Sequence, residues 1–263
     1  MVAKKKLAKK ETAKKAEKKK ETLPESIAGI AAVLVSGIFI ITFVVQAFEI
    51  PSGSMENTLL VGDHVFVDRF TPTLKAGYTG PVMAYRQIRH GDTIVFLHPD
   101  PAQQGMYVVK RIIGVPGDRI HLRNGVVYRN GEALNEPYRM PESGNYEPFR
   151  DEFPKYPPPV MPDVPIEWTA VLRENTRGED LVVPQDSYFG MGDHRGNSLD
   201  SRYWGFIPRK NIIGRPLFIY WSFETPEDQY KKTLMSERLS FLGHVVFHFF
   251  DETRWRRMFH LVR

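Results

Sequence analysis

Three short segments of the chain combine residue types that can do chemistry. They are PSGSM at 51–55, YVVKR at 107–111 and GDHRGNSLDSRYWG at 192–205. A serine hydroxyl attacks a carbonyl when a base removes its proton, and that base is a histidine or an uncharged lysine. Gly53 permits a turn that presents a neighbouring serine, and Lys110 interrupts an apolar run. If Lys110 is buried, its pKa falls toward the working pH, as a general base requires.

Composition excludes several other kinds of site. The chain of 263 residues has no Cys, which excludes thiol nucleophiles, thiolate zinc sites, iron–sulfur clusters and disulfides. The formal charge of +5 arises in the first 25 residues, which hold ten Lys and four Glu, whereas the remaining 238 hold 26 basic and 27 acidic side chains. Because this remainder is close to neutral, nucleic acid is not a predicted partner.

An apolar stretch precedes all three segments. Residues 27–48 contain no charged side chain, and as a helix they would extend about 33 Å, enough to cross a bilayer. The lysines within residues 1–26 predict that this tail stays in the cytoplasm and that the chain after Glu49 lies outside. Val45-Gln46-Ala47 has the small-residue pattern of a signal cleavage site, but the long charged region and long apolar stretch favour an uncut anchor.

The remainder is predicted to be mainly antiparallel β-sheet. Strand-like runs occur at 64–70, 92–97, 106–115, 167–172, 181–183, 188–191 and 212–221. Asn124-Gly125 and Asn130-Gly131 predict tight hairpins, because both residue types tolerate positive φ. Residues 137–165 hold nine of the twenty Pro and predict a connector. We therefore expect a catalytic β domain at 49–123 and 187–263, with a smaller inserted β-rich region at 124–186.

The last apolar run, residues 241–250, is too short to span a membrane. Arginines and aromatic residues follow it up to residue 263. This composition fits a segment lying on a membrane surface, or a helix or strand packed on the main body, and the sequence does not choose between them.

Four motifs in their order resemble the conserved boxes of bacterial type I signal peptidases. They are PSGSMENTLLVGDHVFVDRF, HGDTIVFLHP, YVVKRIIGVPGDRI and GDHRGNSLDSRYWGFIP, behind an N-terminal anchor. The resemblance implies a membrane-bound serine endopeptidase with a Ser-Lys dyad. Its expected partners are the signal peptides of exported preproteins and the lipid bilayer. Its expected place is the bacterial inner membrane, with one span, a cytoplasmic N-terminus and an extracytoplasmic catalytic domain.

The resemblance also implies residue roles. Ser54 matches the nucleophile and Lys110 the general base, while Ser52 matches the hydroxyl that holds the oxyanion together with the backbone N–H of Ser54. Ser198 matches the hydroxyl that orients the lysine, and Asp200 and Arg202 match a pair that braces the site. Phe48, Ile50 and Val109 match the apolar positions that line the pockets for small substrate side chains. No cofactor or metal is implied.

Three residues depart from the pattern of that family. Asn57 stands where a Pro is frequent, and His194 and Gly196 change the last box from its frequent form GDNRDNS. These departures affect supporting positions and leave Ser54 and Lys110 in place.

Rival readings are weaker. A triad of His194, Asp193 and Ser198 would need sequence neighbours to adopt a geometry that neighbours seldom reach. His244, His248 and Asp251 could share one helical face as metal ligands, but histidines in an aromatic stretch are more often packing residues. A self-cleaving repressor would need a DNA-binding domain. The alternative to an enzyme is a membrane-anchored envelope interaction protein of the same fold, in which the motifs serve only structure.

Overall fold

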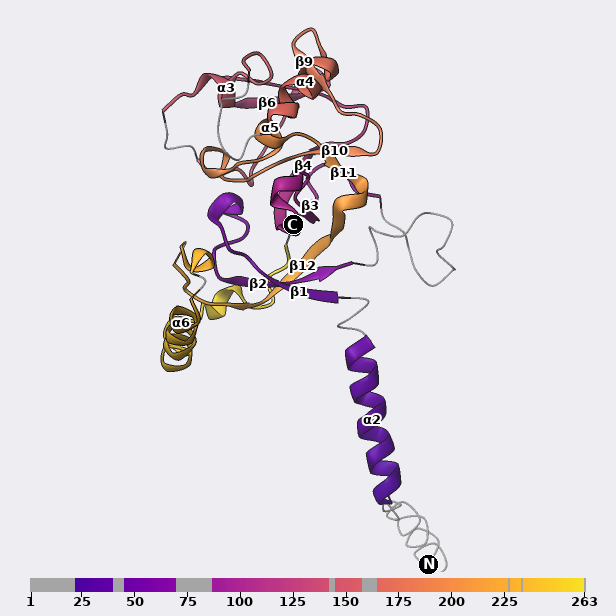
Figure 1. Cartoon of the computed structure of the whole chain (residues 1–263), viewed down its shortest axis with the longest axis vertical. Coiled ribbons are helices and arrows are strands. Elements are labelled where there is room, and N and C mark those ends of the chain that lie inside the picture. The colour runs from indigo at the N-terminus through magenta and orange to yellow at the C-terminus, as the bar shows by residue number, and fades with distance from the viewer. Residues whose placement is uncertain are drawn as a thin grey trace, which may run out of the picture. The chain divides into compact units, whose positions relative to one another are not determined.

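The computed structural model describes residues 22–39, 45–69, 87–141, 145–157, 165–226, 228–232 and 234–262. The chain divides into two compact units, residues 1–42 and 43–263. Figure 1 shows the elements of both units.

The first unit contains one described helix, α2, from Leu23 to Phe39. Local hydrogen bonds mark the start of α2, because the Glu25 carboxylate accepts hydrogen bonds from the backbone N–H and the hydroxyl of Thr22, both at 2.9 Å. Its apolar side chains are exposed, Val33 by 73% and Leu34 by 58%. Within the described part of the chain, no helix is long and apolar enough to cross a membrane.

The expected helix over 27–48 is wrong at its C-terminal end. Val45–Glu49 forms a strand, β1, which pairs antiparallel with β2, Asp63–Asp68. The backbone of β1 therefore hydrogen-bonds to a neighbouring strand, and Phe48 packs on a buried apolar cluster. Residues 40–44, which also belonged to the expected helix, lie outside the described residues.

The second unit is built on two antiparallel sheets (Figure 1). The larger has the order β1-β2-β12-β3-β4-β10-β11. Its remaining strands are β3 Thr93–Leu97, β4 Tyr107–Gly114, β10 Ser187–Met191, β11 Ile207–Pro208 and β12 Ile212–Ser222. The prediction of a mainly antiparallel β domain is confirmed, because every pairing in this sheet is antiparallel.

The smaller sheet has the order β7-β6-β5-β9-β8. Its strands are β5 Arg119–Arg123, β6 Val126–Arg129, β7 Glu132–Ala133, β8 Thr176–Arg177 and β9 Asp180–Val182. Both predicted Asn-Gly turns join its hairpins, and Asn124, Gly125, Asn130 and Gly131 all have positive φ. The sheet starts at Arg119 rather than at the expected residue 124, because β5 pairs with β6 and β9 and, among the described strands, with none of the larger sheet.

The strand expected at 167–172 is also wrong. Residues Ile166–Asn175 form helix α4, which buries Trp168 and Leu172. These two positions are four residues apart, a spacing that fits one face of a helix and one face of a strand equally well. The other helices of this region are short: α3 Pro148–Asp151 and α5 Ser201–Trp204.

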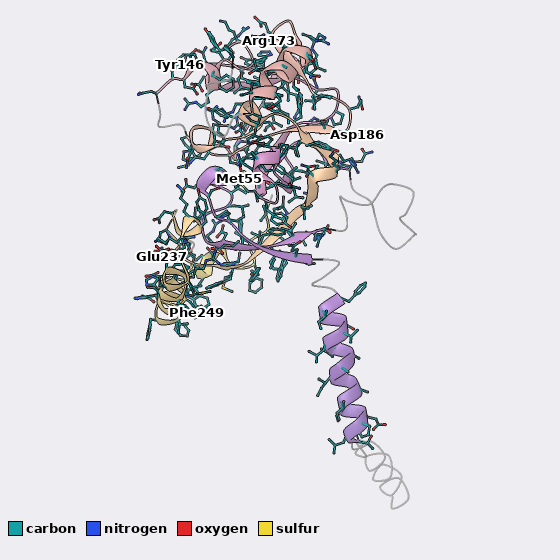
Figure 2. All side chains as sticks on the ribbon, viewed as in Figure 1. Met55, Tyr146, Arg173, Asp186, Glu237 and Phe249 are labelled. Carbon is teal, nitrogen blue, oxygen red and sulfur yellow. The ribbon has the colours of Figure 1, made fainter. Side chains whose placement is uncertain are left out.

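The C-terminal stretch contains helix α6, Met235–Phe247. The Phe241 and His244 rings lie 6.3 and 6.1 Å from the ring of Phe223, just after β12. A helix, rather than a strand, is therefore what residues 241–247 form; it contacts Phe223 on one side, and its apolar side chains Val246 and Phe247 are 68% and 87% exposed. Figure 2 labels Glu237 and Phe249 in this part of the unit.

Candidate active site

Ser54, the candidate nucleophile, lies in the loop 50–62 that connects β1 to β2, called the nucleophile loop below. Two backbone hydrogen bonds close this loop, from Ile50 N to Asp63 O at 2.8 Å and from Gly62 N to Ile50 O at 3.0 Å. A short 3₁₀ helix, η2, spans Gly53–Met55 and buries Ser54, which is 8% exposed. The loop therefore holds the hydroxyl inside the unit, immediately beyond β1.

Lys110 lies in the middle of β4, between β3 and β10. It pairs with Ile94 on β3. Its side chain is buried, as are the four strand residues that follow it, 111–114. The alternation of the sequence left its orientation open. In the structure the Lys110 side chain points into the protein interior, since almost no part of it reaches solvent.

These two side chains meet in the structure. Lys110 Nζ donates a hydrogen bond to Ser54 Oγ at 2.6 Å, although the residues are 56 positions apart. Burial lowers the pKa of Lys110 from its ordinary value to about 8, because a desolvated ammonium is unfavourable. The arrangement therefore supplies a hydroxyl in contact with an amine that is neutral in mildly alkaline solution, which is what nucleophilic attack on a carbonyl requires.

A buried ion pair stands close to the amine. Arg202 binds the carboxylate of Asp200 with two parallel hydrogen bonds of 2.8 Å, and both side chains are at most 1% exposed. Burial is the largest influence on the pKa of Asp200 and opposes its ionisation, but the charge and hydrogen bonds of Arg202, the charge of Lys110 and the backbone N–H of Gly192 together outweigh it and lower the pKa of this carboxyl. The Asp200 charge raises the pKa of Lys110 and that of Arg202 lowers it, so the guanidinium offsets the carboxylate.

Ser198 and Ser52 lie at the edges of the site. Ser198 is buried, and its hydroxyl has no hydrogen-bond partner among the described residues. Gly192 separates it from the nucleophile loop, since a Cβ at Gly192 would collide with both Ser198 and the carbonyl oxygen of Ser54. Ser52 is exposed and precedes η2 in an extended conformation, without a side-chain capping bond.

The three apolar residues expected near the substrate share one cluster. Ile50 is 2% exposed, and Phe48 and Val109 pack against the buried members of its cluster. Met55, the residue after the nucleophile, belongs to the same cluster and is labelled in Figure 2. The cluster therefore contains the chain neighbours of both dyad residues, since Met55 follows Ser54 and Val109 precedes Lys110.

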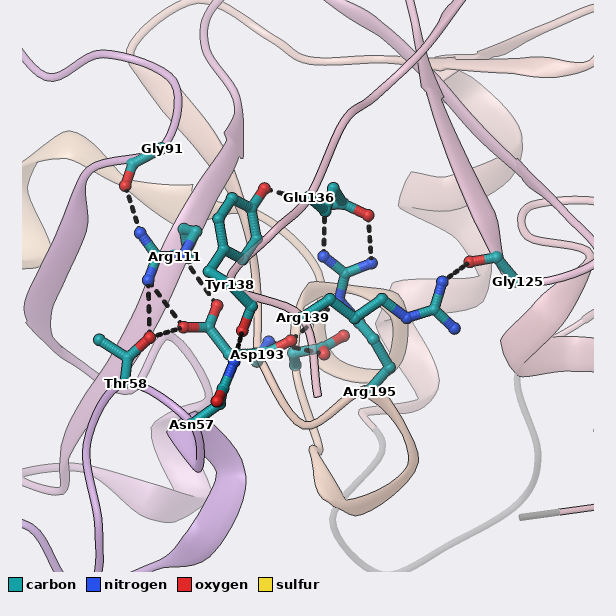
Figure 3. Close-up of polar contacts among 12 residues, drawn as sticks. Asn57, Thr58, Gly91, Arg111, Gly125, Glu136, Tyr138, Arg139, Asp193 and Arg195 are labelled. Carbon is teal, nitrogen blue, oxygen red and sulfur yellow. Dashed lines mark hydrogen bonds and ion pairs between the residues drawn. The ribbon is translucent and has the colours of Figure 1, made fainter. Parts of the chain in front are cut away.

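Sequence reasoning missed a buried polar network beside the dyad, drawn in Figure 3. The carboxylate of Asp193 accepts hydrogen bonds from Arg111 at 2.7 and 2.8 Å and from the hydroxyl of Thr58 at 2.5 Å. Arg111 also donates to the carbonyl of Gly91 at 2.7 Å. These contacts join β4, the nucleophile loop and the segment after β10, each of which carries a candidate site residue.

A second layer of the network comes from the chain after β7. The Tyr138 ring lies 4.1 Å from the guanidinium carbon of Arg111, and its hydroxyl donates to Glu136 at 2.9 Å. Glu136 also binds Arg195, whose other nitrogen donates to the Gly192 carbonyl at 2.9 Å. Burial and the nearby Glu136 carboxylate raise the pKa of Tyr138 well above its ordinary value. Arg111 and Asp193 stand in the motifs that the sequence singled out, Asp193 only as a member of a rival triad, whereas Glu136 and Tyr138 had no sequence signal.

Two departures from the expected motif pattern have identifiable roles. Asn57 has a φ of 87°, which proline cannot adopt, and its side-chain amide donates to the carbonyl of Tyr138 at 2.9 Å. His194 Nδ1 lies 3.0 Å from a carboxylate oxygen of Glu56, while its backbone N–H donates to the carbonyl of Ser54. The imidazole of His194 is therefore paired with a glutamate, and the nucleophile's side-chain partner is Lys110.

The chain is similar to known proteins over most of its length. Residues 23–221 match the family described as signal peptidase, peptidase S26. Signal peptidase I of Buchnera aphidicola (subsp. Acyrthosiphon pisum) is 28% identical, over 84% of this chain and 82% of that protein. Probable signal peptidase I-2 of Synechocystis sp. is 31% identical, over 78% of each chain. The crystal structure of a signal peptidase I from Enterococcus faecalis V583 is 28% identical with a TM-score of 0.34, covering 49% of this chain and 97% of that one.

Proposed function

Because the chain belongs to the signal peptidase family, peptidase S26, we propose that it cleaves signal peptides by attack of Ser54, with Lys110 as the general base. It is a type I signal peptidase, a serine peptidase that acts on the signal peptides of exported proteins. The observation that carries the assignment of the dyad is the 2.6 Å contact between the buried Lys110 amine and the Ser54 hydroxyl.

In the proposed mechanism the neutral amine of Lys110 takes the proton of Ser54 as its oxygen attacks the peptide carbonyl. The C–N bond of the tetrahedral intermediate then breaks, and Lys110 returns the proton to the leaving amine. A water molecule, deprotonated by Lys110, attacks the acyl-enzyme and releases Ser54. The backbone N–H of Ser54 and the hydroxyl of Ser52 hold the oxyanion, and donors of this kind are typically worth about 10²- to 10³-fold in rate.

Ser198, Asp200 and Arg202 are proposed to support the amine. The Ser198 hydroxyl is buried and unbonded, so it is able to accept a hydrogen bond from Lys110 when the serine is engaged with substrate. Arg202 pairs with Asp200 and partly offsets the rise that the Asp200 charge causes in the pKa of Lys110.

Phe48, Ile50 and Val109 are proposed to contact the substrate residues that precede the cut. They share one apolar cluster, and Val109 directly precedes Lys110, which suits small uncharged side chains. Cleavage after an A-x-A-like site is the expected outcome.

The N-terminal segment is proposed to anchor the enzyme in the bacterial inner membrane as a single span, with the lysine-rich tail in the cytoplasm and the catalytic unit outside. The support is the lysine block before the apolar stretch and the exposed apolar side chains of α2. Alkaline extraction should leave the protein in the membrane fraction, and protease added to spheroplasts should digest the catalytic unit. Release by alkali, or protection of that unit, would contradict the anchor or its orientation.

The dyad is tested by incubating the purified full chain with an exported precursor and sequencing the new N-terminus. Ser54→Ala and Lys110→Met should each lower cleavage by at least about 10⁴-fold, because the two groups act as a unit. His194→Ala serves as the matched control and should retain cleavage, since its imidazole pairs with Glu56. Normal cleavage by either dyad variant would overturn the assignment and favour a purely structural role for the motifs.

A further inference from the structure

The C-terminal end of α6 gathers three side chains that can ligate a metal. His244 and His248 are one helical turn apart, and their ring centroids lie 4.4 Å from each other. The helical hydrogen bonding continues past Phe247, since His248 N donates to His244 O at 2.9 Å and Glu252 N donates to His248 O at 3.0 Å. This extra turn brings Glu252 back to the face that carries both histidines.

The donor atoms converge. Glu252 Oε2 lies 2.7 Å from His244 Nε2, and Glu252 Oε1 lies 3.7 Å from His248 Nδ1. One ligand atom from each of the three residues falls within 4.8 Å of the others. Tetrahedral zinc with ligands at 2.0–2.2 Å places its donor atoms about 3.3 Å apart, so small rotations of the side chains are enough to enclose an ion.

We propose that His244, His248 and Glu252 form a binding site for a divalent transition metal of the Zn²⁺ class. Two imidazoles and one carboxylate are borderline ligands that suit zinc and do not suit Ca²⁺ or Mg²⁺, which prefer oxygen. The three side chains are 42%, 44% and 26% exposed, so an ion has access from solvent and water can complete its coordination. Asp251 also lies 2.9 Å from His248 Nδ1, but Glu252 is the acidic residue whose donor atoms converge with those of both histidines, so the structure gives Glu252 as the third ligand.

The proposed metal site lies where the end of α6 contacts the segment just after β12. The His244 ring packs against Phe223, and the backbone carbonyl of Glu252 accepts a hydrogen bond from Glu224 N at 3.1 Å. Thr253, the next residue, forms an isolated β-bridge with Phe223. A metal bound by His244, His248 and Glu252 therefore links the end of α6 to Glu252 and Thr253, which pair with the segment just after β12. Its role is structural and separate from the Ser54–Lys110 chemistry.

The test is metal binding by the untagged, chelator-treated full chain, followed by calorimetry with ZnCl₂ and by the visible spectrum of the Co²⁺ form. We expect saturation near one ion per chain and intense absorption typical of tetrahedral cobalt. His244→Ala, His248→Ala and Glu252→Gln should each weaken the affinity at least about tenfold. Zn²⁺ should raise the thermal midpoint of the parent and leave that of the triple variant unchanged.

Two matched controls sharpen the result. Asp251→Asn removes a carboxylate that contacts His248 Nδ1 at 2.9 Å and competes with the ion for that nitrogen, and His260→Ala removes a histidine outside the group; neither should lower the affinity below that of the parent. Because the three ligands are partly exposed, the metal-free variants should melt close to the parent, which separates lost binding from lost folding. Absence of saturable binding by the parent, or equal losses in control and ligand variants, would overturn the site. The measurement is independent of whether Ser54 and Lys110 perform the cleavage.

Discussion

A lysine serves as a base only while its amine is uncharged, and the surroundings of Lys110 favour that form. Burial is the largest influence on its pKa, and the neighbouring charges of Asp200 and Arg202 act in opposite directions. A serine elsewhere on the surface would meet a protonated lysine at neutral pH. In the proposed mechanism, the reactivity of Ser54 therefore depends on the desolvation of the Lys110 amine.

The pH dependence of cleavage follows from this. The base must be deprotonated, so kcat/KM for a precursor should rise with pH and level off above an apparent pKa of about 8. Below that pH the amine is charged and the rate should fall about tenfold per pH unit. Initial rates measured across neutral and alkaline buffers check this. A flat profile through pH 8 would show that another group supplies the base.

Arg202 offers a second test at this scale. Arg202→Met removes the positive charge that offsets Asp200, so the pKa of Lys110 should rise and the limb of the kcat/KM profile should move to higher pH. Arg202→Lys keeps the charge and should retain more of the parent profile. A variant of Arg202 that loses activity equally at every pH would show a structural role only, and circular dichroism at each pH identifies unfolding.

At the scale of elements, strand β4 connects the residues of the site. It carries Lys110 toward Ser54, and it carries Arg111 to Asp193, which follows β10. Thr58 connects the same carboxylate to the nucleophile loop. Three segments distant in the sequence are therefore held by one buried carboxylate that is fully hydrogen-bonded.

Removal of the Asp193 carboxylate should lower the free energy of unfolding strongly. Asp193→Asn leaves the buried Arg111 without its counter-charge, and loss of one partner of a buried pair typically costs about 3–5 kcal/mol. Urea unfolding followed by fluorescence gives the free energy. Asp186→Asn is the matched control, because Asp186 is exposed and already at positive φ, where Asn is favourable; it should change stability by less than about 0.5 kcal/mol. Similar stabilities for the two variants would refute the importance of the network.

At the scale of the whole catalytic unit, the C-terminal segment secures the loop that carries the nucleophile. Arg257, in the 3₁₀ helix η7 at Trp255–Arg257, binds the buried carboxylate of Asp63 and donates to the carbonyl of Thr58 at 3.0 Å. Arg254 donates to the carbonyl of Val61 at 2.9 Å. The last residues of the chain thus hold the same loop that β1 and β2 position from the other side.

Arg257→Gln should consequently destabilise the unit. Asp63 is fully buried and would keep only neutral partners such as Ser222, so a cost of about 2–3 kcal/mol is expected. Arg256→Gln changes an exposed neighbour and should be close to neutral. Thermal and urea unfolding of the two variants provide the comparison. Equal stability of both would mean that Asp63 does not rely on the C-terminal segment.

The sequence alone determined the features that local chemistry encodes. Both Asn-Gly hairpins, most strands and the identity of the motifs depend on turn preference, alternation and residue order. Local patterns failed where one spacing fits two structures, as at Trp168 and Leu172 in α4, or where a distant strand competes with an apolar helix, as at β1.

Only the tertiary structure determined which side chains come into contact and which are shielded from solvent. The contact between Lys110 and Ser54 spans 56 positions, and that between Arg257 and Asp63 spans 194. No periodicity along the chain records such pairs, because they arise when strands from distant segments become neighbours in one sheet. The lowered pKa of Lys110 is likewise a property of its packed surroundings, since the same lysine in an open strand would keep its ordinary pKa.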